Sequence, residues 1–149
     1  MVNGSRIKLM VCGSRSITDA DWVKAEIGSF WYNEIAWVDE CIMIEGEARG
    51  VDTYAKEYAQ ENNWTIESYP ANWEKFGKSA GFIRNEEMVK ACDVCLIIWD
   101  GQSLGTKHDI DLCIKHNKPY RILIYNDTVK ERYYDKYAGH PLNLEVIYG

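Results

Sequence analysis

The chain has 149 residues, 46% of them hydrophobic, and a formal net charge of −6. This size and composition are typical of one globular domain, and the longest apolar runs fall far short of the roughly 20 residues of a membrane-spanning helix. The acidic balance argues against nucleic acid as a partner, because nucleic-acid-binding proteins usually carry a basic stripe. Since no apolar signal segment stands at the N-terminus, we expect one cytoplasmic domain over residues 1–149, without membrane association.

The cysteine count argues against a disulfide framework. There are five cysteines, at positions 12, 41, 92, 95 and 113, and an odd number without a signal segment is typical of reduced thiols. Cys92 and Cys95 form a C-x-x-C pair, but no second pair or histidines at matching spacing accompany it. We therefore expect small buried side chains, no metal and no cofactor.

Strands and helices are expected to alternate along the first half of the chain. The expected elements are a strand at 7–12, a helix capped by Thr18 or Asp19, a strand at 41–44, a turn at 46–50, a helix from Val51 that ends at Asn62 and Asn63, and a strand at 64–69. The first helix would bury an apolar face at helical spacing, formed by Trp22, Val23, Ile27, Phe30, Trp31 and Ile35.

The same alternation continues in the second half. The expected elements are a polar loop at 71–79, a helix at about 80–92, a strand at 94–99, a loop at 100–105, a helix capped by Thr106 that carries Ile110, Cys113 and Ile114, a strand at 120–125, a polar helix at about 129–137 and an edge strand at 144–148. Strands joined by helices predict an α/β fold, a Rossmann-like three-layer sandwich with a mostly parallel sheet of five or six strands.

Ligands bind such sheets beyond the carboxyl ends of the strands, so the loops there supply the candidate binding residues. After the first strand they are Gly13, Ser14 and Arg15, and after the second they are Gly46, Glu47, Arg49, Gly50 and Asp52. The glycines allow close approach of a ligand, and Arg15 suits a phosphate. Glu45 and Glu47 suit ribose hydroxyls or acid–base chemistry, whereas Asp52 is also explained as a complement to the helix dipole.

The later loops add Trp73, Arg84 and Asn85, and then Asp100, Gly105, Thr106 and Asp109. Arg84 stands near a helix start, where a cation is disfavoured unless it faces an anionic ligand. Gly105 and Thr106 precede a helix in a phosphate-cradle arrangement, and Asp109 lies one turn further on. Trp73 would stack on a base or pack beneath the loop.

Four motifs occur in a recognisable order along the chain. They are Val11-Cys12-Gly13-Ser14-Arg15, Gly46-Glu47-Ala48-Arg49-Gly50-Val51-Asp52, Ala71-Asn72-Trp73-Glu74 with Gly81-Phe82-Ile83-Arg84-Asn85-Glu86-Glu87-Met88, and Gly101-Gln102-Ser103-Leu104-Gly105-Thr106. Over roughly residues 7 to 125 the chain resembles the YspA-type (DUF2493) proteins. These belong to the SLOG superfamily, which groups the DNA-processing protein DprA with the LOG cytokinin-activating enzymes. The resemblance implies a Rossmann-like fold and a nucleotide-type ligand.

The resemblance to LOG enzymes also implies catalytic residues. Those enzymes cleave the N-glycosidic bond of a nucleoside monophosphate with an Arg and a Glu. Arg84 matches the first motif, and Asp109 stands in place of the Glu, one methylene shorter. Glu47 is a second carboxylate that could stabilise the oxocarbenium-like transition state.

Three functions follow from these residues. We favour a protein that senses or sequesters a nucleotide or an NAD- or ADP-ribose-derived small molecule, of which a phage-encoded copy that sequesters a defence signal is one form. The alternative is a LOG-like phosphoribohydrolase that uses Glu47, Arg84 and Asp109. The third, a DNA-associated role like that of DprA, is opposed by the acidic charge.

A homo-oligomer is also expected. The chain carries more large aromatic residues than a small core easily hides, among them Trp22, Trp31, Trp37, Tyr133 and Tyr134. LOG-like proteins are commonly dimers, which points the same way.

Overall fold

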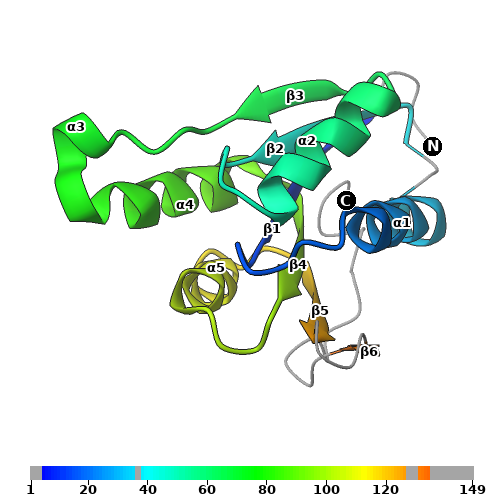
Figure 1. Cartoon of the computed structure of the whole chain (residues 1–149). Coiled ribbons are helices and arrows are strands. Elements are labelled where there is room, and N and C mark those ends of the chain that lie inside the picture. Colours follow the sequence, from blue (N-terminus) through cyan, green and yellow to red (C-terminus); the bar gives the residue numbers. More distant parts are fainter. Residues whose placement is uncertain (1–4, 36–37, 127–130, 135–149) are drawn as a thin grey trace.

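A six-stranded sheet forms the centre of the computed structural model, which describes residues 5–35, 38–126 and 131–134 (Figure 1). In chain order the elements are β1 (Arg6–Gly13), α1 (Ala20–Phe30) continued by a π-helical turn (Trp31–Ile35), β2 (Glu40–Glu45), α2 (Val51–Glu61), β3 (Thr65–Ser68), α3 (Trp73–Phe76) followed by a 3-10 turn (Gly77–Ser79), α4 (Ala80–Ala91), β4 (Val94–Trp99), α5 (Leu104–Lys115), β5 (Tyr120–Asn126) and β6 (Glu131–Tyr134). The predicted Rossmann-like α/β fold is confirmed.

The strand order is β3-β2-β1-β4-β5-β6, with β1 to β5 parallel and β6 antiparallel to β5. The chain moves outward from β1 in one direction through β2 and β3, and then crosses back to β4 on the other side of β1. At such a reversal the loops after the two central strands separate and leave a crevice at the carboxyl edge of the sheet. The loops after β1 and β4 therefore border the expected ligand site.

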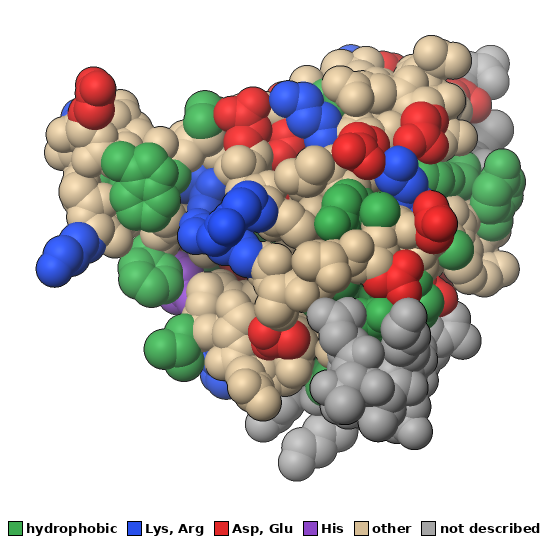
Figure 2. Space-filling model, viewed as in Figure 1, with side chains coloured by type: hydrophobic (Ala, Val, Ile, Leu, Met, Phe, Trp, Pro, Cys, Tyr) green, Lys and Arg blue, Asp and Glu red, His purple; other side chains and the backbone are tan. Residues whose placement is uncertain are grey.

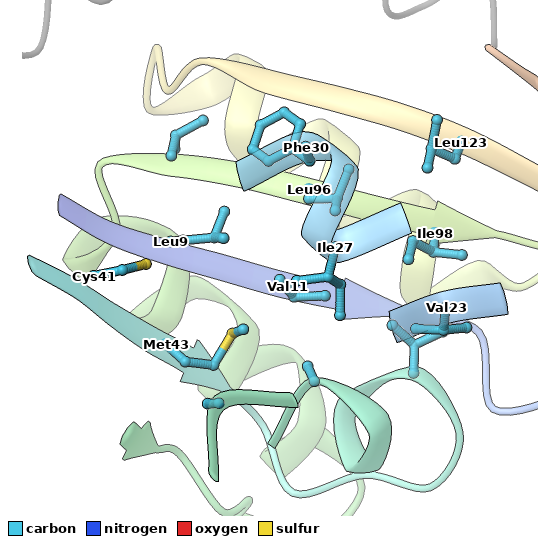
Figure 3. Packing of buried hydrophobic residues seen from close by; sticks show 14 of the residues in the cluster. Leu9, Val11, Val23, Ile27, Phe30, Cys41, Met43, Leu96, Ile98 and Leu123 are labelled. Atoms are coloured by element: carbon cyan, nitrogen blue, oxygen red, sulfur yellow. The ribbon is translucent and has the colours of Figure 1, made fainter. Parts of the chain in front are cut away.

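Alternate residues of the central strands point to opposite helical layers, which is why β4 is entirely apolar and β1 is apolar from Leu9 to Cys12. Leu9, Val11, Leu96 and Ile98 face α1 and α2, whereas the residues between them face α4 and α5. Figure 3 shows Val23, Ile27 and Phe30 of α1 lying over these strands. Helices on both faces of the sheet complete the three layers.

The structure corrects several predicted boundaries. Asp19 caps α1, as expected, by accepting a hydrogen bond from Trp22 N. Helix α5 begins earlier than predicted, because Ser103 and not Thr106 stands at its N-cap. Of the three residues that it was expected to carry, Ile110 and Cys113 are buried and Ile114 is 58% exposed. The expected loop at 71–79 contains α3 and the 3-10 turn, since the Asn72 side chain caps the short helix through Lys75 N.

The C-terminal prediction was wrong where it can be compared. Strand β6 pairs with β5 at Glu131–Tyr134, inside the segment that was expected to be a polar helix. The rest of that helix and the edge strand expected at 144–148 lie outside the described residues. None of the described helices is long and apolar enough to cross a membrane.

Two of the aromatic residues that suggested an oligomer pack within the chain. The Trp22 ring lies 4.5 Å from that of Tyr125, and the Trp31 ring lies 4.9 Å from that of Trp64, measured between ring centroids. Trp37 and the side chains of Tyr133 and Tyr134 lie outside the described part. The aromatic content is therefore a weaker argument for an oligomer than the sequence alone suggested.

The end of β1 tolerates no side chain at Gly13, and this gives a first prediction. A Cβ placed there would stand 2.2 Å from the backbone oxygen of Ile98 and 2.7 Å from Val51 Cγ2. Because backbone atoms would have to move, Gly13→Ala should lower the free energy of unfolding by about 1–3 kcal/mol or more, measured by urea denaturation.

Gly105→Ala is the matched control for that substitution. Gly105 lies within α5, and no described atom comes within 4 Å of a Cβ placed there. Alanine is favoured over glycine in a helix by up to about 1 kcal/mol, so this variant should be as stable as the native protein or more so. Equal stability of the Gly13→Ala and native proteins would contradict the close packing of β1 against β4.

Candidate functional site

A cavity of about 390 Å³ opens at the carboxyl edge of the sheet, where the loops after β1 and β4 separate. Its volume falls within the range of small-molecule sites. Its walls are formed by Cys12, Gly13, Arg15, Ser16, Ala48, Asp52, Arg84, Asn85, Met88, Asp100, Ser103, Gly105, Thr106 and Asp109. Figure 2 shows Lys and Arg side chains gathered on this face of the molecule, between the parts formed by α2, α4 and α5.

Ser14 joins the loops beneath the cavity. Its backbone N–H donates to Ile98 O at 3.0 Å, and its hydroxyl accepts from Asp100 N at 3.0 Å and shares a hydrogen bond with Thr106 at 3.2 Å. The side chain is 1% exposed, so its hydrogen-bonding groups are occupied by the protein itself. The candidate ligand residue Ser14 thus lies behind the cavity wall and fixes the positions of residues that form it.

Asp100 organises the start of α5. Its carboxylate accepts hydrogen bonds from Gln102 N at 2.9 Å, Ser103 N at 2.7 Å and the Ser16 hydroxyl at 2.7 Å. Burial by itself would raise the pKa of Asp100, but these hydrogen bonds outweigh it and the pKa lies below its ordinary value. The charge is therefore held in place beside the first turn of α5, whose residues Gly105 and Thr106 line the cavity.

Asp52 and Arg84 meet against Gly46. A Cβ at Gly46 would stand 2.7 Å from Arg84 Nη1 and 2.9 Å from Asp52 Oδ2, so only glycine leaves room for both side chains. Gly46 N donates to Asp52 Oδ2 at 2.9 Å, and Arg84 Nη1 donates to Gly46 O. The loop after β2 thus brings an acid from α2 and a base from α4 into one wall.

Neither arginine of the cavity forms a salt bridge with a carboxylate in the part of the chain that the structure describes. Arg84 is oriented by neutral acceptors, since its Nε donates to Asn85 Oδ1 at 2.8 Å and its Nη1 reaches Tyr69 O at 3.5 Å. Arg15 is exposed at the rim. Two cations without a salt bridge among the described residues leave the cavity able to pair with an anion.

Two buried carboxyls form the floor. Burial raises the pKa of Asp52 to about 6, although the N–H of Gly46 and the charge of Arg84 partly oppose it. Burial, followed by the neighbouring charge of Asp52, raises the pKa of Asp109 to about 8. Asp109 is 5% exposed, and its Oδ1 has no hydrogen-bond partner among the described residues. At neutral pH Asp109 therefore carries a proton, whereas Asp52 is mainly ionised.

Of the predicted site residues, nine lie in the cavity wall, namely Gly13, Arg15, Asp52, Arg84, Asn85, Asp100, Gly105, Thr106 and Asp109. Gly46 and Gly50 lie behind it, where Gly50 adopts a φ of 74° and abuts Ser14. Glu47, Arg49 and Trp73 are not in the wall: Glu47 pairs with Lys56 at 3.4 Å, and Trp73 on α3 is 54% exposed. The sequence therefore predicted most of the cavity wall correctly, but it also predicted these three residues, which lie elsewhere.

Glu45 has a structural place that the sequence did not reveal. It is fully buried at the end of β2, where its carboxylate accepts hydrogen bonds from Ser68 on β3 and from Glu47 N.

Sequence reasoning also missed five wall residues, namely Cys12, Ser16, Ala48, Met88 and Ser103. Ser16, Ala48 and Ser103 lie within the loops that the sequence had already identified as candidate binding loops. Their place in those loops is the sequence feature from which they could have been predicted. Among the described residues, no cluster of three or more His, Cys, Asp or Glu side chains has the arrangement of a metal site.

The first half of the chain matches a known protein family. Residues 7–76 match the YspA, cpYpsA-related SLOG family. This segment belongs to that family. The resemblance seen in the sequence is confirmed, and the match includes the loops after β1 and β2. The chain is also 47% identical over 73 residues to the Gene 61 protein of Mycobacterium phage D29, a match that spans 45% of this chain and 58% of the phage protein.

Solved structures of DNA processing protein A share the fold. The protein from Helicobacter pylori superimposes with a TM-score of 0.57 and 21% identity, covering 79% of this chain and 65% of that one. The protein from Streptococcus pneumoniae gives 0.63 and 16%, covering 78% and 50%. The chain thus spans half to two thirds of the length of these neighbours.

One of these neighbours corrects the expectation about nucleic acid. The Helicobacter pylori structure is described as showing a single-stranded DNA binding mode. The argument from net charge against nucleic acid as a partner was therefore wrong, because this fold serves a DNA-binding protein. The physical reason is that a net charge of −6 is summed over the whole chain, whereas the cavity wall carries two arginines without a salt-bridge partner among the described residues.

The buried carboxyl of Asp109 gives a second prediction, on stability. In the unfolded chain it loses its proton near pH 4, but in the folded protein it does so only near pH 8. Between these values the unfolded state has released a proton that the folded state keeps, so a rise in pH destabilises the fold. Asp109→Asn removes this effect and should be more stable than the native protein at pH 8, by at least about 1 kcal/mol, and little different at pH 4.

Thermal unfolding at both pH values measures the effect, and Asp111→Asn is the control. Asp111 is exposed on the same helix and pairs with Lys107, so its loss should cost at most about 1 kcal/mol at pH 8. An Asp109→Asn protein that is less stable than the native one at pH 8 would contradict the assignment of a buried proton.

Proposed function

We propose that the protein senses or sequesters a nucleotide, or a small molecule derived from NAD or ADP-ribose, in the cavity at the carboxyl edge of its sheet. The observation that carries this proposal is the pair of arginines in the cavity wall, which form no salt bridge with a carboxylate among the described residues. A charge-assisted hydrogen bond from each to a phosphate oxygen would supply affinity and orientation.

The start of α5 supports a phosphate in the same place. Ser103 at its N-cap makes no side-chain cap bond, so backbone N–H groups of the first turn remain available, and Gly105 leaves open space above them. Helix N-termini of this kind attract anions through the free N–H groups and the helix dipole. The start of α2, whose N-cap is Gly50, also borders the cavity through Asp52 in its first turn.

A binding role agrees better with the floor than catalysis does. Glycosidic cleavage needs a carboxylate beside the developing positive charge. Asp109, which stands where LOG enzymes have their Glu, is protonated at neutral pH, and Glu47 is outside the wall. The ionised carboxylate of the wall, Asp52, is held by the N–H of Gly46. Sequestration by a phage-encoded copy is one form of the binding role, and the phage D29 relative agrees with it.

The binding proposal predicts that Arg15→Gln weakens ligand binding. Loss of one charge-assisted hydrogen bond costs about 1.5–3 kcal/mol, so the dissociation constant should rise by roughly 10- to 100-fold. The ligand is first identified by mass spectrometry of small molecules released from the purified protein by heat. Titration calorimetry then uses that compound, or a panel of nucleoside monophosphates, NAD, ADP-ribose and cyclic nucleotides.

Lys56→Gln is the matched control for Arg15→Gln. It removes the same charge from the surface of α2, outside the cavity wall, where Lys56 pairs with Glu47. We expect its affinity to stay within about twofold of the native value, since exposed ion pairs contribute little. If both variants weaken binding equally, Arg15 acts only through net charge; if the native protein binds no compound of the panel, the nucleotide proposal is wrong.

The alternative is a phosphoribohydrolase in which Arg84 holds the phosphate. The observation in its favour is that Arg84 and Asp109, the residues matched to the LOG motifs, line one cavity. Release of free base and ribose phosphate over time, abolished by Asp109→Asn, would identify the enzyme. A ligand that is recovered unchanged after prolonged incubation would identify the binding protein.

A single-stranded oligonucleotide belongs in the same panel because of the DNA-binding neighbour. A strand bound through its phosphates would show an affinity that falls steeply with salt, in proportion to the number of phosphates contacted. A single nucleotide held in the cavity would show a much weaker dependence.

A further inference from the structure

Asp109 has an atom that the protein itself leaves without a partner. Its Oδ1 is inaccessible to solvent and makes no hydrogen bond among the described residues, although the side chain forms part of the cavity wall. An unsatisfied buried oxygen costs far more on a charged carboxylate than on a neutral carboxyl, so the surroundings of Oδ1 favour a protonated Asp109 in the cavity wall. The other carboxyl of the floor, Asp52, is satisfied by Gly46 N.

Burial and the charge of Asp52 on α2 favour a neutral carboxyl at Asp109. The Cys12 thiol on β1, through a hydrogen bond, and the charge of Arg84 on α4 oppose it, and Arg15 and Asp100 line the same cavity from the loops after β1 and β4. Asp52 is a like charge in the same cavity, and two carboxylates sharing one buried site resist ionising together. Arg84 is turned towards Gly46 O and Asn85 and forms no salt bridge with Asp109.

We propose that Asp109 determines which ligand the cavity accepts, by donating a hydrogen bond from its neutral carboxyl to an uncharged acceptor such as a ribose oxygen. This rests on the proposed function, and it assigns the phosphate to the arginines and the start of α5, and the sugar to the floor. An ionised carboxylate could only accept hydrogen bonds, so it would prefer the donor groups of a ligand. The raised pKa of Asp109, due first to burial, agrees with this assignment.

The test is the binding of ribose 5-phosphate between pH 7.5 and 9.5. In this range the phosphate is already a dianion and Asp52 is ionised, so among the floor groups only Asp109 changes its charge. The affinity of the native protein should fall by about 10- to 30-fold across this range, because the donor form is lost above a pKa of about 8. Calorimetric titration measures it.

Two substitutions distinguish the effect of a hydrogen bond donated by residue 109 from the effect of its lack of charge. Asp109→Asn keeps a neutral donor, and should bind at pH 7.5 within about threefold of the native protein and lose the pH dependence. Asp109→Leu is neutral, similar in size and unable to donate, and should bind at least about fivefold more weakly at pH 7.5. Asp111→Asn, outside the cavity wall, should keep the native pH profile.

Each outcome decides a different point. Binding that does not change with pH, or that Asp109→Leu retains in full, overturns the role of Asp109 while the nucleotide proposal stands. Absence of ribose 5-phosphate binding at every pH, when a nucleotide of the panel does bind, overturns the assignment of the sugar to the floor and leaves the nucleotide proposal standing. Absence of binding by ribose 5-phosphate and by the whole panel overturns both. The carboxyl carbon resonance of Asp109 in the free protein gives a ligand-independent check, since titration near pH 4 would by itself contradict a neutral carboxyl at pH 7.

Discussion

The cavity depends on the close contact between the ends of β1 and β4. Gly13 has no side chain because Ile98 O and Val51 occupy the space, and the next residue, Ser14, bonds to Ile98 O, Asp100 N and Thr106. These bonds hold the loops after two neighbouring strands and the first turn of α5 at fixed positions. Because Ser14 is buried, it serves the ligand only through the residues that it positions. The arginines and carboxyls of the wall are placed by this junction and by the Gly46 turn.

That arrangement creates a cavity with two distinct ends. The rim and the start of α5 offer Arg15 and free backbone N–H groups, which favour an anion, whereas the floor offers two buried carboxyls with different protonation. Rossmann-like folds host many activities, so the shared fold with DNA processing protein A defines the scaffold and not the ligand. The specific chemistry comes from the loops, and the family match over residues 7–76 includes two of them.

The sequence predicted the sheet and most of the cavity wall because both depend on local patterns. Continuous apolar runs give β1 and β4, and the glycine-rich loops after them give Gly13, Arg15, Gly105 and Thr106. The sequence could not show that Glu45 and Glu47 have different roles. Only the pairing of β2 with β3 buries Glu45 beside Ser68 and leaves Glu47 near Lys56. Net charge likewise gave a wrong exclusion of nucleic acid, because it does not describe how charges are distributed. The proton of Asp109 depends on burial by several elements distant in sequence, which no single motif reports.

The most direct test of the central claim is a crystal structure of the protein soaked with adenosine monophosphate. The account predicts difference density in the cavity, with the phosphate within hydrogen-bond distance of Arg15 or Arg84 and the start of α5, and a ribose oxygen facing Asp109. Density for the nucleotide at another surface, with the cavity unchanged, would contradict the assignment of this cavity as the ligand site.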